Sequence, residues 1–280
     1  MEAEDDVHVD HVPCPLSAAI NSELQLLRKR HRGQPECYRL STARLAMAPR
    51  EPTTTLVHFW FRTRYVSASA CQISHLHSHV LGLRICPSTM ARFFTSASQL
   101  LPAFIRSWVQ AIFPEWFLPD RAVLKIQKPG EDQEIMDEYF DTEIKAYRWL
   151  KPLQGVIIPK FYGLLRYNGT RAMLLEYLRG VSLYSPEAGT MTLEELSSLL
   201  QPCYRAIDAF GVHQDDANLL NFQLVEGKIK VLDLESVVFL YSADQREFFI
   251  VSSIHHLASQ YLSMRAHYSF PHRRYLEAAA

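Results

Sequence analysis

Apolar residues recur with helical spacing or alternate with polar ones along most of the chain from residue 98 onward. Between residues 98 and 113 they lie three and four apart, which predicts an amphipathic helix: Leu101, Phe104, Ile105, Trp108, Ile112 and Phe113. Pro102 near the start suits a first helical turn. We expect this helix to pack against the chain's own sheet, and docking on a partner or a membrane surface is the alternative.

The next segment predicts a strand, a helix and a hairpin in succession. Residues 121–127 (RAVLKIQ) alternate like a strand, and residues 131–150 form a helical pattern with an acidic first half, which suits the positive end of the helix dipole. Apolar runs at 161–167 and 171–177 flank Asn168-Gly169, a strong signal for a two-residue hairpin turn.

The last third predicts two helices around a second hairpin. Thr192 and Glu195 form a capping box that begins a helix reaching to about Phe210, and Gly211 ends it. A loop at 213–220 leads to a hairpin of 221–225 and 228–234, turning at Glu226-Gly227. One more helix is expected from about 247 to 264.

Residues 1–90 show weak periodicity, and we expect a poorly ordered or loosely packed extension there. Its basic cluster at 28–32 is interpreted as a solvated helix end, with a nuclear-localisation patch as the alternative. His75, His77 and His79 would share one face of a strand. We favour no metal at these histidines, because no carboxylate or cysteine accompanies them at ligand spacing.

The amino-acid composition argues against several classes of function. The 280 residues are 48% hydrophobic and 21% charged, with a net charge of −1, so net charge gives no case for nucleic-acid binding. No uninterrupted apolar stretch is long enough to predict a membrane span. The five cysteines form no C-x-x-C pair, which fits a reducing, cytoplasmic location, with the nucleus as an alternative. Only 10 residues are glycine, and the chain has neither a P-loop nor G-x-G-x-x-G.

Three charged residues stand out within or at the end of largely apolar elements. Glu143 lies on the apolar stripe of the 131–150 helix, and a buried carboxylate there needs a partner. Lys125 faces away from Leu124 in the preceding strand, and the strand, turn and helix can bring the lysine and the glutamate together. Asp233 ends an apolar strand, which is a favourable place for a cation ligand or simply a turn.

A cluster of acids and amides precedes the second hairpin. Asp215 and Asp216 lie five to six residues before Asn221, and this group together with Asp233 could coordinate Mg²⁺ and orient a nucleophile. Taken alone, the cluster is also typical of turns.

The order of these features resembles the protein-kinase-like superfamily, in particular its small divergent fungal-type members related to aminoglycoside phosphotransferases. The resemblance covers roughly residues 119–262 and implies a role for each matching residue. Lys125, in Ala-Val-Leu-Lys, would contact the α- and β-phosphates of ATP, and Glu143 would pair with it. Residues 174–178, with Glu176 and Leu178, would form the hinge that meets the adenine. Asp216 would accept the proton of the substrate hydroxyl, and Asn221 and Asp233 would bind Mg²⁺.

The implied fold is α+β and two-lobed. The predicted N-lobe, residues 91–178, holds a small antiparallel sheet, and the predicted C-lobe, residues 179–280, is short and mainly helical. The implied partners are ATP and a hydroxyl-bearing acceptor, either a small molecule or a protein. The implied activity is Mg²⁺-dependent transfer of the γ-phosphate to that acceptor.

Several positions depart from the superfamily's pattern and favour an alternative, a kinase-fold binding module with little or no catalysis. No glycine-rich loop precedes Lys125, and Gln214 and Asp215 stand where histidine and arginine are usual. His213 with Asp215 offers a rival register, although Asn221 then falls six residues after the aspartate instead of five. Glu235 replaces the glycine that usually follows the metal-binding acid, and nothing resembling Ala-Pro-Glu follows it.

Overall fold

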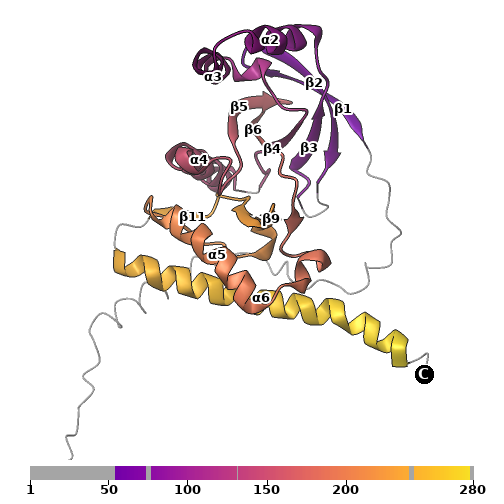
Figure 1. The fold of residues 1–280 in the computed structure, drawn as a ribbon, viewed down its shortest axis with the longest axis vertical. Helices are drawn as coiled ribbons and strands as arrows, with labels where there is room; N and C mark the ends of the chain where they lie inside the picture. The colour runs from indigo at the N-terminus through magenta and orange to yellow at the C-terminus, as the bar shows by residue number, and fades with distance from the viewer. Residues whose placement is uncertain (1–53, 74–76, 131, 240–242, 278–280) are drawn as a thin grey trace, which may run out of the picture. The chain divides into compact units, whose positions relative to one another are not determined.

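The computed structural model describes residues 54–73, 77–130, 132–239 and 243–277 (Figure 1). Within these residues the protein is a mixed α+β structure with a curled antiparallel sheet of six strands, two small sheets and five α-helices. The basic cluster at 28–32 and His75 lie outside the described residues. No helix of the described part is long and apolar enough to cross a membrane.

The six-stranded sheet has the order β1-β2-β3-β4-β6-β5, and all neighbouring strands are antiparallel. Its strands are β1 (Thr55–Phe61), β2 (Arg64–Gln72), β3 (Val80–Ile85), β4 (Arg121–Ile126), β5 (Phe161–Tyr167) and β6 (Thr170–Glu176). The β5–β6 hairpin turns at Asn168 and Gly169, whose φ angles are 50° and 82°. These left-handed values fit the turn that the Asn-Gly pair predicts.

The prediction of a loosely packed extension up to residue 90 is wrong for residues 55–85, which form β1, β2 and β3. Phe61 and Val66 are fully buried there, in a core shared with β4 and β6. The alternation in β1 is hard to recognise because Leu56 and Trp60 are apolar yet exposed, while Val57, Phe59 and Phe61 point inward. The sheet therefore begins well before the predicted boundary at residue 91.

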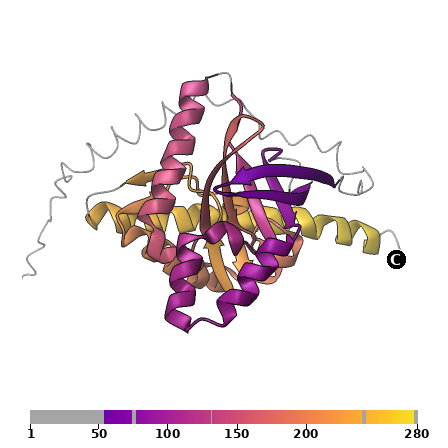
Figure 2. The same cartoon turned by 90° about the horizontal axis from the view of Figure 1, so that it is seen from above.

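Two helices and a short 3₁₀ turn connect β3 to β4. They are α2 (Thr89–Gln99), α3 (Ala103–Ile112) and η3 (Pro114–Trp116). Figure 2 shows α2 and α3 meeting at an angle, and their main contacts are with each other and with η3. The expectation that this segment packs against the sheet is wrong for its apolar stripe, because Phe104 and Trp108 are 75% and 65% exposed.

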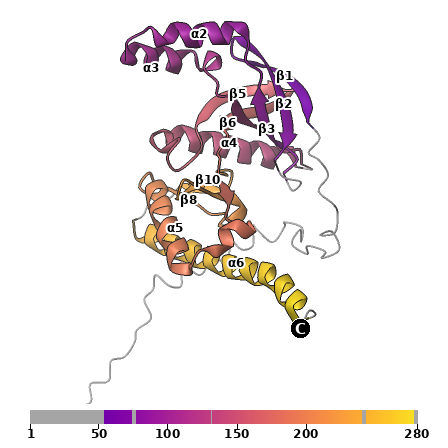
Figure 3. The same cartoon turned by 45° about the vertical axis from the view of Figure 1, so that its right-hand side comes forward.

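The rest of the chain forms helices and two small sheets around a second core. Helix α4 (Gln133–Trp149) follows β4, and α5 (Leu193–Asp208) lies against α6 (Ala243–Glu277) (Figure 3). One small sheet has the order β10-β9-β7 and the other pairs β11 with β8. Their bounds, with the remaining 3₁₀ turns, are η4 (Lys151–Leu153), β7 (Val181–Ser182), η5 (Pro186–Thr190), β8 (Val212–Gln214), η6 (Leu219–Asn221), β9 (Phe222–Val225), β10 (Lys228–Val231) and β11 (Val237–Phe239).

Strand β6 separates the two cores. Ala172 and Leu174 point into the core of the curled sheet, whereas Met173 and Leu175 point into the core formed by α4, α5 and α6. Strand β4 alternates in the same way, with Leu124 in the first core and Val123 packed against the second. Because side chains alternate along a strand, Lys125 emerges on the side of α4.

Candidate functional site

The centre of the site is the ammonium group of Lys125. Its Nζ donates to Glu143 Oε1 at 2.8 Å and to Asp233 Oδ1 at 2.9 Å, and it lies 3.7 Å from Glu235 Oε2. Lys125 and Glu143 are both buried. The pairing of Lys125 with Glu143 that the sequence predicts is therefore present, and the structure adds two carboxylates to it.

Three elements position these groups. Lys125 lies in β4, Glu143 faces it from α4, and Asp233 and Glu235 follow β10. Asp132 caps α4 by accepting from the backbone amides of Glu134 and Ile135, which fixes the start of the helix close to the end of β4. About three helical turns after this cap, Glu143 lies on the buried face with Phe140 and Tyr147.

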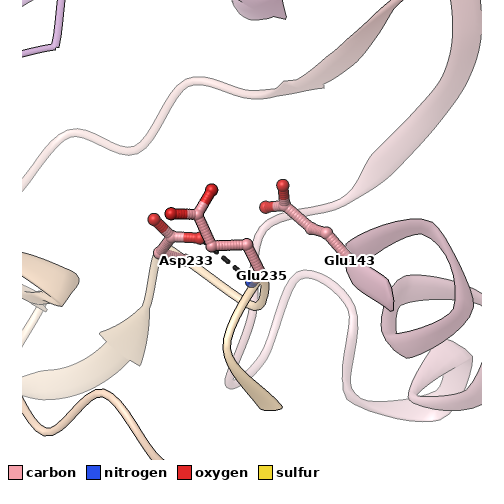
Figure 4. A group of neighbouring side chains, drawn as sticks. All are labelled: Glu143, Asp233 and Glu235. Carbon is pink, nitrogen blue, oxygen red and sulfur yellow. Dashed lines mark hydrogen bonds between the residues drawn. The ribbon is translucent and has the colours of Figure 1, made fainter. Parts of the chain in front are cut away.

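The stretch after β10 holds two carboxylates on one side. The backbone amide of Glu235 donates to Asp233 Oδ1 at 3.1 Å, which turns the chain so that both side chains face Glu143 (Figure 4). Gln214 Nε2 donates to the backbone carbonyl of Asp233 at 2.6 Å and anchors this turn to β8. Glu235 also binds Lys128, which lies three residues after Lys125.

Glu235 and Lys128 are members of the cluster that the sequence analysis missed. In the sequence, Glu235 stands out only as a replacement for glycine, and Lys128 belongs to no motif. The available signal is the spacing Asp-Leu-Glu, because alternate residues of an extended segment point to the same side. The sequence around Lys128 holds no comparable signal, since a lysine before Pro129-Gly130 is typical of a solvated turn.

The charges of the cluster shift its pKa values in different directions. Burial opposes the charge on Lys125, but Asp233, Glu143 and Glu235 outweigh it and hold the lysine pKa well above its usual value. Burial also acts against an ionised Asp233, yet the two lysines and the hydrogen bonds lower its pKa. Burial raises the pKa of Glu143 to about 7, and Lys125 only partly offsets this. Three carboxylates thus compete for two ammonium groups, and the most deeply buried one ionises least readily.

A second pair of predicted residues forms a separate hydrogen-bonded unit. Asn221 Nδ2 donates to Asp216 Oδ2 at 2.9 Å and to the Asp216 carbonyl at 3.2 Å. Burial raises the pKa of Asp216, and the hydrogen bond from Asn221 partly opposes this. The backbone amide of Leu232 donates to the Asn221 carbonyl at 2.8 Å, which joins this unit to the segment carrying Asp233.

The loop that carries Asp216 rests on a buried polar network. His213 in β8 contacts Asp208 Oδ1 through Nδ1 at 3.3 Å and Ser253 Oγ through Nε2 at 3.2 Å. All three side chains are buried. The contacts connect the end of α5, β8 and α6, so they hold the start of the loop at a fixed place.

The predicted hinge residues lie at the end of β6. Glu176 Oε2 accepts from the backbone amide of Lys160 at 3.0 Å, so its side chain is used in a local contact with the start of β5. Leu178 is buried. The structure thus places Glu176 and Leu178 where the chain leaves the six-stranded sheet for the helical core, while their predicted contact with adenine stays a prediction.

Three carboxylates lie close enough to share a cation, and in this structure the cation between them is the ammonium of Lys125, so a divalent ion would have to bind beside the lysine or displace it. Oxygen atoms of Glu143, Asp233 and Glu235 all lie within 4.8 Å of one another. Carboxylate oxygens are the ligands that Mg²⁺ prefers in proteins. The predicted ligands Asp233 and Asn221 are linked through the Leu232–Asn221 backbone contact. The Asn221 amide nitrogen is committed to Asp216, which makes its Oδ1 the atom suited to a metal.

Comparisons with protein-family models and with curated proteins find no match to this chain.

Proposed function

We propose that the protein is an ATP-dependent phosphotransferase of the protein-kinase-like superfamily, which transfers the γ-phosphate to a hydroxyl acceptor with Mg²⁺. The observation that carries this proposal is the contact of Lys125 with both Glu143 and Asp233. The three residues come from a strand, a helix and the end of a hairpin, and 18 and 108 residues separate the lysine from its two partners. This is the combination of lysine, helix glutamate and metal-binding aspartate that the resemblance implies.

The arrangement supplies the functions that phosphoryl transfer needs. Such reactions depend on positioning and on charge stabilisation more than on covalent chemistry by the protein. In the proposal Lys125 contacts the α- and β-phosphates, and Glu143 holds the lysine in place. Asp216, oriented by Asn221, accepts the proton of the acceptor hydroxyl. Mg²⁺ bound by Asp233 and Asn221, with Glu235 at hand, would neutralise charge on the phosphates.

The proposed two-lobed arrangement is supported by the position of β6. Strands β1 to β5 of the curled sheet come before β6 in the chain, and α5 and α6 of the helical core come after it. The predicted hinge at 176–178 lies between these two groups of elements. In this proposal the sheet corresponds to the N-lobe, extended by β1 to β3, and the helical core corresponds to a short C-lobe.

A second candidate function is a kinase-fold binding module without catalysis. Glu235 favours it, because its carboxylate lies near Lys125 and binds Lys128, so both cations already have acidic partners. A phosphate group would have to displace these partners. The residues between Gly82 and Gly130 also include no glycine, so no flexible glycine loop directly precedes β4.

Turnover separates the two functions. Release of phosphate or ADP from ATP is measured with Mg²⁺ for the full chain and for Asp216→Asn. An active phosphotransferase hydrolyses ATP slowly when water replaces the acceptor, and Asp216→Asn should reduce that rate by at least ~100-fold. Binding of ATP with no turnover in either protein would establish the binding module instead. Equal turnover in both proteins would remove Asp216 from the mechanism.

A further inference from the structure

The helices α2 and α3 expose an apolar surface that the proposed function does not use. Along α3, Phe104, Trp108 and Ile112 lie four residues apart and form one stripe, with exposed fractions of 75%, 65% and 39%. Leu100, in the turn before α3, is 87% exposed, and Phe93 of α2 is 64% exposed. We call Phe93, Leu100, Phe104, Trp108 and Ile112 the α2–α3 surface.

The stripe on α3 is turned away from the rest of the protein. An amphipathic helix ordinarily buries its apolar face and exposes its polar face. In α3 no residue is fully buried, and Arg106, on the opposite side of the helix from Phe104, is more shielded than the aromatic residues. A stripe of exposed apolar side chains along one helix face is typical of an interaction site.

The charge around this surface indicates what covers it. Residues 52–114 contain five arginines and no aspartate or glutamate, although Arg64 is buried and Arg62 lies 3.9 Å from Glu115, which directly follows this range. Arg92 on α2 and Arg84 at the strand end that leads into α2 are exposed. Arg62 is exposed on the β1–β2 turn and donates to the carbonyl of Ile112 at 3.0 Å, which places a cation at the end of α3.

We propose that the α2–α3 surface docks on an anionic lipid membrane. Helices that lie in the membrane interface insert Trp, Phe and Leu side chains between the lipids and keep cations at the headgroups. Leu100 and Ile112 are aliphatic, which favours a lipid environment over the base stacking of a nucleic acid. The negative surface potential of anionic lipids attracts arginines that lie near the headgroups. In this arrangement the protein lies on the surface and does not span the bilayer.

The α2–α3 surface and the candidate site lie in different parts of the described structure. Figures 1 and 3 show helices α2 and α3 at the end of the structure farthest from α5 and α6, whereas Lys125 contacts Glu143 of α4 and Asp233 after β10. Docking and phosphoryl transfer therefore use different parts of the described structure. This inference does not depend on the proposed function and can fail independently of it.

Co-sedimentation with lipid vesicles tests the proposal. The full chain is mixed with phosphatidylcholine vesicles, with or without phosphatidylserine, at low and high salt. The apolar variant is Leu100→Ser/Phe104→Ser/Trp108→Ser. The matched control is Phe248→Ser/Val251→Ser/Leu262→Ser, which removes three exposed apolar side chains from α6. Circular dichroism establishes that both variants are folded.

The expected result is binding to the phosphatidylserine vesicles that weakens with salt, because the attraction to the arginines is screened. The α6 control should bind like the parent chain, and the apolar variant should bind at least tenfold more weakly, a loss of about 1.4 kcal/mol or more. Arg84→Glu/Arg92→Glu keeps the apolar side chains and should also weaken binding to the acidic vesicles.

Three results would overturn the proposal. The first is no binding to either kind of vesicle. The second is binding that the apolar variant retains in full. The third is a parent chain that does not bind vesicles while the apolar variant differs from it in another property. A changed oligomeric state would assign the surface to a second copy of the chain, and changed binding to a single-stranded oligonucleotide would assign it to a nucleic acid.

Discussion

Lys125 and Asp233 are separated by 108 residues in the sequence, and 2.9 Å separates the lysine Nζ from the aspartate Oδ1. The contact joins β4 of the curled sheet to the turn that follows β10 of a small sheet. It also makes Lys125 the common partner of three carboxylates, because Glu143 and Glu235 lie within 2.8 and 3.7 Å of the same nitrogen. Several consequences of this shared lysine can be measured.

Replacing the lysine should destabilise the protein. In Lys125→Met the buried Glu143 and the adjoining Asp233 lose their main cation, and an uncompensated buried charge typically costs about 3–5 kcal/mol. Chemical denaturation at neutral pH measures the free energy of unfolding. Lys228→Met, at the exposed β9–β10 turn, is the control and should change it by less than about 0.5 kcal/mol. Equal stability of the two variants would show that Lys125 does not compensate the carboxylates.

The effect of Glu143→Gln should depend on pH. The pKa of Glu143 is raised from 4.5 to about 7 in the folded protein, so between these values the folded state holds a proton that the unfolded state has released. The stability that this group contributes to the folded state is fully present below pH 4.5 and is lost as the pH rises through 7. Glutamine remains neutral, so the parent chain should lose stability relative to Glu143→Gln as the pH rises from 4.5 to about 7, with little further change above that. Denaturation curves of both proteins over that range measure the difference, and a constant difference would contradict the raised pKa.

Asp216 and Asp215 should differ in their effect on turnover. Asp216 accepts a hydrogen bond from Asn221, five residues later in the chain, which orients the Asp216 carboxylate. We expect Asp216→Asn to reduce turnover by at least ~100-fold with little change in ATP binding. Asp215→Asn is the matched control, and we expect a small effect. The opposite outcome, with turnover lost only in Asp215→Asn, would support the rival register that starts at His213.

Two cysteines should react very differently with thiol reagents. Cys86 is exposed, whereas Cys203 is buried in α5, where burial raises its pKa to about 12. Alkylation requires the thiolate, so at pH 8 the native protein should be modified at Cys86 and not at Cys203. Peptide mass spectrometry after labelling measures both sites, and labelling in denaturant is the control that should modify Cys203. Rapid native labelling of Cys203 would show that the α5–α6 packing opens.

Interactions between residues close in sequence predict several of the turns and helices of the fold. The Asn168-Gly169 and Glu226-Gly227 turns, the capping box at Thr192 and the α4 helix all follow from interactions between near neighbours. Alternation in β4 also places Lys125 on the side of Glu143. These features are predictable because the residues that determine them lie within a few positions of one another.

The parts that sequence reasoning missed depend on distant partners. β1 carries apolar side chains on both faces, so its alternation does not show which face is buried, and only pairing with β2 decides it. The stripe on α3 predicts a helix correctly but does not say whether the stripe faces the protein. The Asp-Leu-Glu spacing indicates that Glu235 lies on the side of Asp233, but only the turn of the chain after β10 brings Glu235 close to Lys125 and Lys128.

Binding of ATP tests the central claim most directly. Thermal unfolding of the full chain is followed with ATP, with and without Mg²⁺, and repeated for Lys125→Met and Asp233→Asn. The account predicts a Mg²⁺-dependent stabilisation of the parent chain, about 2.7 kcal/mol at a concentration 100 times the dissociation constant, that is absent from both variants. Failure of saturating ATP to stabilise the parent chain, with or without Mg²⁺, would contradict the account.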